Sequence, residues 1–276
     1  MSVIRVSGLH KTYDGVEALK GIDFEIRAGE VFGLLGPNGA GKTTTIEILE
    51  GYRDRSGGEV EVLGIDPQRA DRAWRERVGV VLQSSSLYPN LTVRESLRTF
   101  GGYYRHSRNV DEVVEIVGLG EKADARVRTL SGGQKRRLDL GLALVGDPDL
   151  IFLDEPTTGF DPGARRTAWE TIRNLRELGK TILLTTHYLD EAEQLADRVA
   201  VLVAGEIVRE GKPSELTGGV VETEIRFRRN GEAVVEHTAE PTARLHELIH
   251  EAGGTELEEL EVLRPTLEDV YLELTE

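Results

Sequence analysis

The chain has 276 residues, 39% of them hydrophobic, which is enough to bury the core of one main domain and a smaller one. Its 49 acidic and 34 basic residues give a formal charge of −15, which opposes non-specific attraction to nucleic acid or anionic lipid. Without cysteine, it can form neither a disulfide framework nor a thiolate metal site. The N-terminus lacks a signal-peptide pattern and no apolar stretch approaches the ~18 residues of a membrane helix, so we expect a chain that does not cross a bilayer.

The first part of the chain combines two kinds of strand. Alternating apolar and polar residues at 3–6, 22–26 and 60–63 predict a small β layer beside a parallel core. The run Glu30–Leu35 is mostly apolar, which is typical of a strand covered on both faces. It leads into the glycine-rich string Gly36-Pro37-Asn38-Gly39-Ala40-Gly41-Lys42-Thr43-Thr44.

This string predicts a phosphate cradle. Its glycines let consecutive backbone N–H groups approach an anion, Lys42 supplies a charge near the β- and γ-phosphates, and the hydroxyl of Thr43 suits Mg²⁺. A helix is expected from Thr43 to Leu49, with its positive N-terminal end facing the same anion. A plain glycine-rich turn is the alternative, but the complete G-x-x-x-x-G-K-T string between a strand and a helix favours the cradle.

Between the cradle and residue 130 the pattern becomes helical. Thr92 and Glu95 fit a capping box ahead of one helix, and residues 110–117 repeat apolar side chains at helical spacing. We therefore expect a helical subdomain at about residues 84–145. Gln83 follows an apolar run at a strand end and carries no signal of its own.

The segment Ser131-Gly132-Gly133-Gln134 has two interpretations. Ser131 and Gln134 fit the capping box that begins a helix, in which case the serine only satisfies backbone donors. The two glycines weaken helix initiation but expose N–H groups at a positive helix end, which indicates a second anion-binding turn.

Two further strand ends carry polar side chains. Leu150–Leu153 predicts a central parallel strand that leads into Asp154 and Glu155. Because neighbouring strand residues point to opposite faces, we expect Asp154 to hold Mg²⁺, directly or through water, and Glu155 to polarise the water that attacks the γ-phosphate. An acidic strand-to-loop junction is the plain alternative. Residues 181–186 predict another buried strand, and His187 falls beyond its C-terminal end, where ligands of open α/β sheets bind; a structural histidine is the alternative.

Beyond Gly218-Gly219 the pattern becomes that of a small α+β unit. The pattern predicts alternating strands around the turn Asn230-Gly231, followed by a helix from Pro241. It then predicts a strand near 260–263 and a last helix at 267–274. The unit shows no catalytic grouping, so we expect it to add stability or to support pairing of chains rather than to sense a ligand.

These motifs, in this order, resemble those of the nucleotide-binding subunit of an ATP-binding cassette (ABC) transporter. The resemblance rests on the cradle, Gln83, the signature Leu130–Gln134, the Asp154-Glu155 pair, Asp161 and His187, and it covers about the first three quarters of the chain. More narrowly, Thr157–Pro162 and the extension ending Leu267–Tyr271 resemble the daunorubicin-resistance-type (ABC-2) exporter ATPases.

The resemblance implies an α/β fold with a P-loop NTPase core, a flanking antiparallel β layer and the helical subdomain within residues 1–217, and a small C-terminal α+β domain at 218–276. It implies a magnesium-dependent ATPase that binds no nucleic acid, pairs with a second copy around two ATP molecules and drives a separate membrane permease. The expected location is cytoplasmic, peripheral on the inner face of the cell membrane, and the expected cargo of the exporter is drug-like or lipid-like.

Residue roles are implied as well. The two copies would lie head to tail, so that ATP held by 36–44 of one is capped by Ser131, Gly132, Gly133 and Gln134 of the other. Gln83 would contact Mg²⁺ and water, His187 would contact the γ-phosphate, and Asp161 would report across the dimer.

Two implied contacts are more open. Tyr13 would stack on adenine, although it could equally be a surface tyrosine. The permease would dock its coupling helix near residues 84–99. The loop Thr158-Gly159-Phe160-Asp161 departs from the usual Ser-Ala-Leu-Asp of the family, which keeps the aspartate but alters the dimer contact.

Two other classes share some of the motifs. A soluble ABC ATPase acting on ribosomes or DNA is one, but ribosome-acting forms usually carry two cassettes and DNA-repair relatives carry a long coiled coil, whereas this insert is short and lacks a sustained heptad pattern. A monomeric P-loop kinase is the other, and it would need neither the signature nor the catalytic glutamate.

Overall fold

The computed structural model describes the chain except residues 83–86, 217–221, 230–231, 253–256, 264–270 and 272–276. The chain divides into two compact units, Met1–Glu210 and Gly211–Glu276. Several predictions lie outside the described residues and stay predictions: Gln83 and its contacts, the division at Gly218-Gly219, the turn at Asn230-Gly231 and most of the last helix.

The first unit is built on a six-stranded sheet in the order β5-β6-β7-β3-β8-β9. The four strand pairs from β5 to β8 are parallel. The strands are β3 (Val31–Leu35), β5 (Val78–Val81), β6 (Leu150–Asp154), β7 (Thr181–Thr186), β8 (Arg198–Val203) and β9 (Glu206–Gly211). The apolar runs that predicted strands at 30–35, 150–153 and 181–186 are therefore confirmed as neighbours in one sheet.

Alternate residues of these strands enter two separate hydrophobic cores. Ile151 and Leu153 of β6 pack into one core, and Leu150 and Phe152 pack into the other. Because successive side chains of a strand point to opposite faces, a strand covered on both faces must be apolar throughout. Asp154 continues the set of Leu150 and Phe152, which determines the face of the sheet on which its carboxylate lies.

The second of these cores is covered by an antiparallel sheet and one helix. The sheet has the order β2-β1-β4, as expected for the predicted β layer. The elements are β1 (Ser2–Tyr13), β2 (Val16–Arg27), α1 (Lys42–Leu49) and β4 (Gly57–Val62), followed by the single turn α2 (Arg72–Arg75). Helix α1 begins one residue earlier than predicted, at Lys42 itself.

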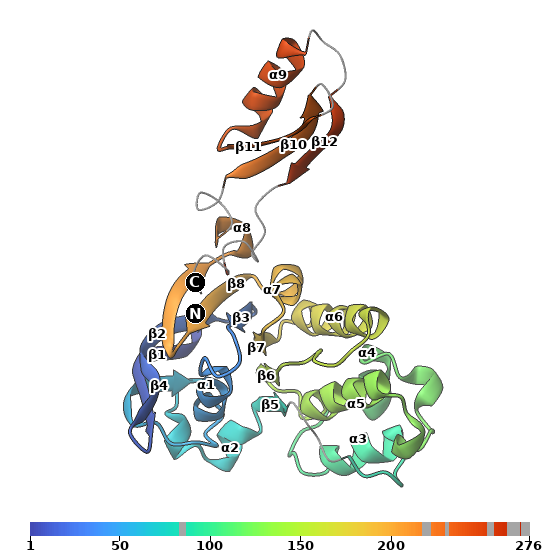
Figure 1. Cartoon of the computed structure of the whole chain (residues 1–276). Helices are drawn as coiled ribbons and strands as arrows, with labels where there is room; N and C mark the ends of the chain where they lie inside the picture. The colour runs from blue at the N-terminus through green and yellow to red at the C-terminus, as the bar shows by residue number, and fades with distance from the viewer. Residues whose placement is uncertain (83–86, 217–221, 230–231, 253–256, 264–270, 272–276) are drawn as a thin grey trace. The chain divides into compact units, whose positions relative to one another are not determined.

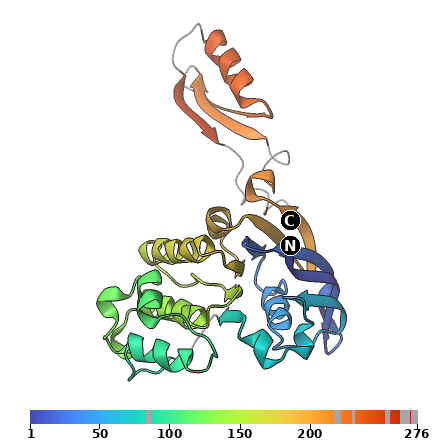
Figure 2. The ribbon, with the colours of Figure 1, turned by 180° about the vertical axis from the view of Figure 1, so that it is seen from behind.

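The first core is covered by helices. These are α3 (Val93–Gly101), α4 (Val110–Ile116), α5 (Gly132–Leu144) and α6 (Pro162–Glu177), with α7 (Leu189–Leu195) following β7. Figure 1 shows α3 to α6 on the opposite side of β5, β6 and β7 from α1, and Figure 2 shows the same separation from behind. Both predicted capping boxes are formed, by Thr92 with Glu95 and by Ser131 with Gln134.

The second unit is a small α+β structure with its own core. Its antiparallel sheet has the order β11-β10-β12, and α9 supplies the buried Leu248 that packs with Ile225 and Phe227. The elements are α8 (Pro213–Leu216), β10 (Thr223–Arg229), β11 (Glu232–Thr238), α9 (Pro241–Glu251) and β12 (Glu258–Leu263). In the described parts of both units, no helix has the length and apolar character needed to span a membrane.

Candidate active site

The loop between β3 and α1 borders a hollow of about 550 Å³. Glu155 and His187, from the ends of two neighbouring strands, line the same hollow. Its lining residues are Ala18, Asn38, Gly39, Gly41, Lys42, Thr43, Thr44, Glu155, Thr158 and His187. All of these except Ala18 and Thr158 are predicted site residues, so the structure brings most of the predicted cradle and both predicted catalytic residues together.

Two positions of the loop accept only glycine. Gly41 has a φ of 111°, and a Cβ atom there would lie 2.8 Å from the carbonyl oxygen of Ala18. At Gly36 a Cβ atom would lie 2.2 Å from the carbonyl oxygen of Leu202. Both distances are below any real contact, so these glycines let the loop pass close to β2 and β8.

Lys42 begins α1 and is almost completely buried. Its Nζ donates to the carbonyl oxygens of Gly36 at 2.7 Å and Pro37 at 3.2 Å, and it lies 3.5 Å from Oε1 of Glu155. Burial lowers the pKa of Lys42, and the negative charge of Glu155 opposes that shift. The ammonium is thus held in place by two carbonyls and one carboxylate, in the pocket where a triphosphate would lie.

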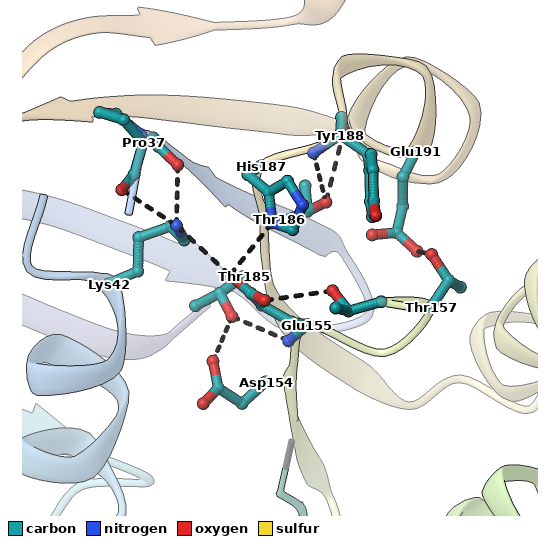
Figure 3. Close-up of polar contacts among 12 residues, drawn as sticks. Pro37, Lys42, Asp154, Glu155, Thr157, Thr185, Thr186, His187, Tyr188 and Glu191 are labelled. Atoms are coloured by element: carbon teal, nitrogen blue, oxygen red, sulfur yellow. Dashed lines mark hydrogen bonds and ion pairs between the residues drawn. The ribbon is translucent and has the colours of Figure 1, made fainter. Parts of the chain in front are cut away.

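The side chains of Lys42, His187 and Thr158 contact the carboxylate of Glu155, and Figure 3 labels the first two. Besides Lys42, Nδ1 of His187 donates to Oε1 at 3.2 Å, and the hydroxyl of Thr158 donates to Oε2 at 3.1 Å. Burial alone would raise the pKa of Glu155, but the hydrogen bond from His187 and the charge of Lys42 outweigh it and hold that pKa below its usual range. Glu155 is therefore a carboxylate at neutral pH, and the Nδ1 bond leaves Nε2 of His187 as its second ring nitrogen for a ligand.

Asp154 is the last residue of β6 and lies deeper than Glu155. Its Oδ1 accepts a hydrogen bond of 2.5 Å from the hydroxyl of Thr185 on β7. Burial raises the pKa of Asp154, and the Thr185 bond offsets part of that shift. A carboxylate and the exposed hydroxyl of Thr43 are hard oxygen donors of the kind that Mg²⁺ prefers. Among the described residues, no group of three or more His, Cys, Asp or Glu side chains is placed to hold a metal ion.

The predicted signature lies at a different hollow. A space of about 410 Å³ is lined by all four residues Ser131–Gln134 and by Asp161, and it meets the first hollow at Thr158, which lines both. Within the signature, the N–H of Gln134 donates to Oγ of Ser131 at 3.3 Å, and the N–H of Ser131 donates to Oε1 of Gln134 at 2.9 Å. The predicted capping box is thus formed, and anion binding by this turn stays a prediction.

Two predicted site residues, Asp161 and Tyr13, make contacts other than the predicted ones. Asp161 is exposed and caps α6, where its Oδ1 accepts from the N–H groups of Gly163 and Ala164, both at 2.9 Å. Tyr13 does not line the first hollow, and its ring centre lies 4.8 Å from Nζ of Lys11 and 5.3 Å from the guanidinium carbon of Arg53. Its stacking on adenine therefore stays a prediction.

Arg136, a buried arginine of α5, was not among the predicted site residues. Its guanidinium donates to the carbonyl oxygens of Asp154 at 3.0 Å and Pro156 at 3.1 Å, and also to that of Leu82, the last described residue before Gln83. The helix that begins with the signature is thereby tied to the turn that carries Glu155. The sequence signal was slight: Arg136 is the first of two adjacent arginines after the signature, at a helix position that the structure buries.

The fold and this site together define a class. A P-loop nucleotide hydrolase has three such parts: a parallel sheet, a glycine-rich loop leading into a helix that begins with lysine, and two carboxylates at the end of another strand of that sheet.

Comparison with known proteins narrows the class. The family model for the ABC transporter matches residues 19–158. Nod factor export ATP-binding protein I of Rhizobium meliloti (strain 1021) is 43% identical over 297 residues, covering 99% of this chain and 88% of the relative. The chain belongs to the ABC transporter family, as an ATP-hydrolysing cassette.

Solved structures agree with this assignment. The ADP conformation of MJ1267, an ATP-binding cassette of an ABC transporter, superposes with a TM-score of 0.70 at 26% identity, covering 78% of this chain and 92% of that chain. The dimeric post-hydrolysis state of the cassette MJ0796, bound to ADP and Pi, gives 0.67 at 28% identity, covering 76% and 98%.

Proposed function

We propose that this chain is the ATPase subunit of an exporter, that it closes on two ATP molecules as a head-to-tail pair, and that it drives a separate membrane permease. The observation that carries the proposal is the separation of the cradle and the signature into two hollows of one chain. Two copies facing each other head to tail would place the signature of each over the cradle of the other, so that each ATP would contact both. The dimeric structures of the MJ0796 cassette support pairing of two copies.

The proposed hydrolysis uses the groups that converge on Glu155. ATP would enter the first hollow with its phosphates on backbone N–H groups of the loop that lines it, and its γ-phosphate would attract Lys42 away from the carboxylate. Glu155 would then accept a proton from a water molecule as that water attacks the γ-phosphorus in line, while the bond from that phosphorus to the β-bridging oxygen breaks and ADP leaves. His187 would steady the γ-phosphate through Nε2.

Mg²⁺ is the proposed cofactor that accompanies ATP. Thr43 and Asp154 would hold it, together with Gln83 if that side chain reaches the site as the family resemblance implies. The ion would neutralise charge on the β- and γ-phosphates.

The permease is proposed to dock on the helical subdomain. An aromatic cluster lies there, in which the ring centre of Phe100 is 6.4 Å from that of Tyr88 and 5.9 Å from that of Tyr103. Tyr88 is 55% exposed and Tyr103 is 64% exposed, which is unusual for neighbouring aromatic side chains without a partner surface. This cluster, Tyr88-Phe100-Tyr103, overlaps the segment 84–99 and suits an apolar coupling helix.

Location and direction follow from the same proposal. A cassette without a membrane span among its described helices would sit at the cytoplasmic face of the cell membrane, held by its permease. Export is the proposed direction because the Rhizobium meliloti relative is named for export of Nod factor, and a drug-like or lipid-like cargo is the proposed class.

The test is co-expression with the membrane protein encoded beside this gene, followed by affinity purification of the chain from detergent-solubilised membranes. We expect a multi-helix protein to co-purify and ATP to drive cargo across vesicles that contain both proteins. The double variant Tyr88→Glu with Tyr103→Glu should lose the permease, whereas Tyr52→Glu, which alters a tyrosine of 79% exposure elsewhere, should keep it. A cassette that hydrolyses ATP as a pair but retains no membrane protein would contradict the proposal.

A further inference from the structure

Glu155 lies in a backbone conformation that residues with a side chain rarely adopt. Its φ of 45° falls in the left-handed region, directly after the last residue of β6. Residues in this conformation persist only where the surrounding structure holds them, and they cluster where a side chain is aimed at a ligand. The proposed base of the reaction therefore depends on the contacts that hold its own turn.

The hydroxyl of Thr185 makes two of these contacts. It accepts a hydrogen bond of 3.1 Å from the backbone N–H of Glu155 and donates one of 2.5 Å to Oδ1 of Asp154. The carbonyl oxygen of Thr185 accepts from the same N–H at 3.2 Å. Figure 3 shows the hydroxyl between the two acidic residues. Thr185 is fully buried, so bulk water does not compete for these bonds.

This placement follows from the register of two strands. Thr185 lies opposite Asp154 in the parallel pair of β6 and β7, so both side chains lie on the same face of the sheet. A hydroxyl can donate and accept at the same time. Both are required here, because the Asp154 carboxylate needs a donor and the N–H of Glu155 needs an acceptor. Valine has the same branched shape and would serve the packing of this strand equally well, but it can do neither.

The opposite side of the turn is held independently. Arg136 donates to the carbonyl oxygens of Asp154 and Pro156, on either side of Glu155. Removal of the Thr185 hydroxyl would therefore leave the turn in place but change the direction in which the Glu155 carboxylate points.

We propose that Thr185 is a positioning residue for ATP hydrolysis, whose single hydroxyl fixes the Asp154 carboxylate and the left-handed backbone of Glu155 relative to each other. The inference rests on the proposed role of Glu155 as the group that accepts a proton from the attacking water. Thr185 acts through the two acidic residues and makes no proposed contact with the nucleotide.

The test compares Thr185→Val, which removes the hydroxyl and keeps the shape, with Thr185→Ser, which keeps the hydroxyl and removes the methyl group. The matched control is Thr181→Val on the same strand, a buried threonine whose hydroxyl accepts a hydrogen bond of 3.0 Å from the N–H of Gly29. For each full-length variant, kcat and KM for ATP, affinity for a labelled ATP and the melting temperature are measured.

We expect Thr185→Val to lower kcat about 10- to 100-fold, as for loss of a hydrogen bond to a charged group. KM and ATP affinity should change less than about 3-fold, because the cradle itself is intact. Thr185→Ser should restore kcat to within about 3-fold of the wild type, and Thr181→Val should keep the wild-type kcat.

An unchanged kcat in Thr185→Val would overturn the inference. An equal fall of kcat in Thr185→Val and Thr185→Ser would also overturn it, because the side chain would then matter only for packing. If the valine variant does not fold, Thr185→Ala and Thr185→Ser differ by one oxygen atom, and equal kcat values for these two would have the same meaning. Failure of the proposed function is distinguishable, because it would appear as full turnover in Glu155→Gln, whatever Thr185 does.

Discussion

Lys42 and Glu155 form an ion pair across the nucleotide hollow, with 3.5 Å between Nζ and Oε1 and with side chains that are only 5% and 11% exposed. The pair joins the start of α1 to the end of β6. The ammonium of Lys42, which would bind the γ-phosphate, is therefore paired with the carboxylate of Glu155, which would activate water. A triphosphate competes with Glu155 for the same ammonium. Binding of ATP would therefore release the carboxylate at the moment when its substrate arrives.

Glu155→Gln should separate binding from hydrolysis. The amide keeps the size of the side chain but cannot accept a proton from water, so we expect turnover to fall by at least ~10²-fold while ATP affinity is retained. ATP that is bound and not split should also trap the paired form, which size-exclusion chromatography with ATP would detect. An unchanged steady-state rate would reject the role of Glu155.

Lys42→Ala should weaken nucleotide binding itself. The triphosphate would lose its nearest compact cation, and we expect the affinity for labelled ATP to fall at least about 10-fold. Lys180→Ala is the matched control, since Lys180 is a partly buried lysine that pairs with Asp147 at 2.7 Å, on residues that do not line the nucleotide hollow. Full affinity in the Lys42 variant would show that the ammonium serves only to hold Glu155.

The two capping boxes allow the capping role of Ser131 to be separated from its proposed role in ATP-dependent pairing. Ser131→Ala and Thr92→Ala each remove the side-chain acceptor of one box, so both should cost about 1 kcal/mol of stability. Only Ser131→Ala should also weaken ATP-dependent pairing, measured in the Glu155→Gln background. If both variants pair as tightly as their parent, Ser131 is a helix cap and nothing more.

Glu50, at the end of α1, should make stability depend on pH. Burial, together with the negative charges of Asp154 and Glu47, raises the pKa of Glu50 to about 8 from an ordinary value of 4.5. The folded chain thus holds this proton more tightly than the unfolded chain, and the stability it contributes is complete below about pH 4.5 and is lost as the pH rises to about 8.

Glu50→Gln stays neutral at every pH and should therefore escape this loss. We expect it to match the wild type near pH 4 and to exceed it by about 1–3 kcal/mol at pH 9, in urea unfolding at both pH values. Comparison of the two proteins cancels the other titrating groups. A stability difference that is the same at both pH values would contradict the raised pKa.

Much of the fold and most of the cradle could be predicted because their signals are local. An apolar run of five residues, a glycine string and a lysine that starts a helix specify β3, the loop and α1 without knowledge of the rest of the chain. The capping boxes at Thr92 and Ser131 are local in the same way, since each joins residues three positions apart.

The missed residues depend on contacts between distant segments. Thr185 reaches Asp154 only because β6 and β7 pair in one particular register, and Arg136 reaches the same turn only because α5 packs beside β5 and β6. Thr158 lines both hollows because of the conformation of its loop, which the adjacent residues in the sequence do not predict. A polar residue that interrupts an apolar run, as Thr185 does after Leu183 and Leu184, is the one sequence signal that could have directed attention to this contact.

The central claim is that one chain owns the cradle for one ATP and the signature for another, so that turnover requires two chains. The most direct measurement is the ATPase rate per chain across a dilution series, with the mass of the species followed by light scattering. The account predicts that the rate per chain falls as the pair dissociates on dilution. A rate per chain that stays constant down to concentrations where only single chains exist would contradict it.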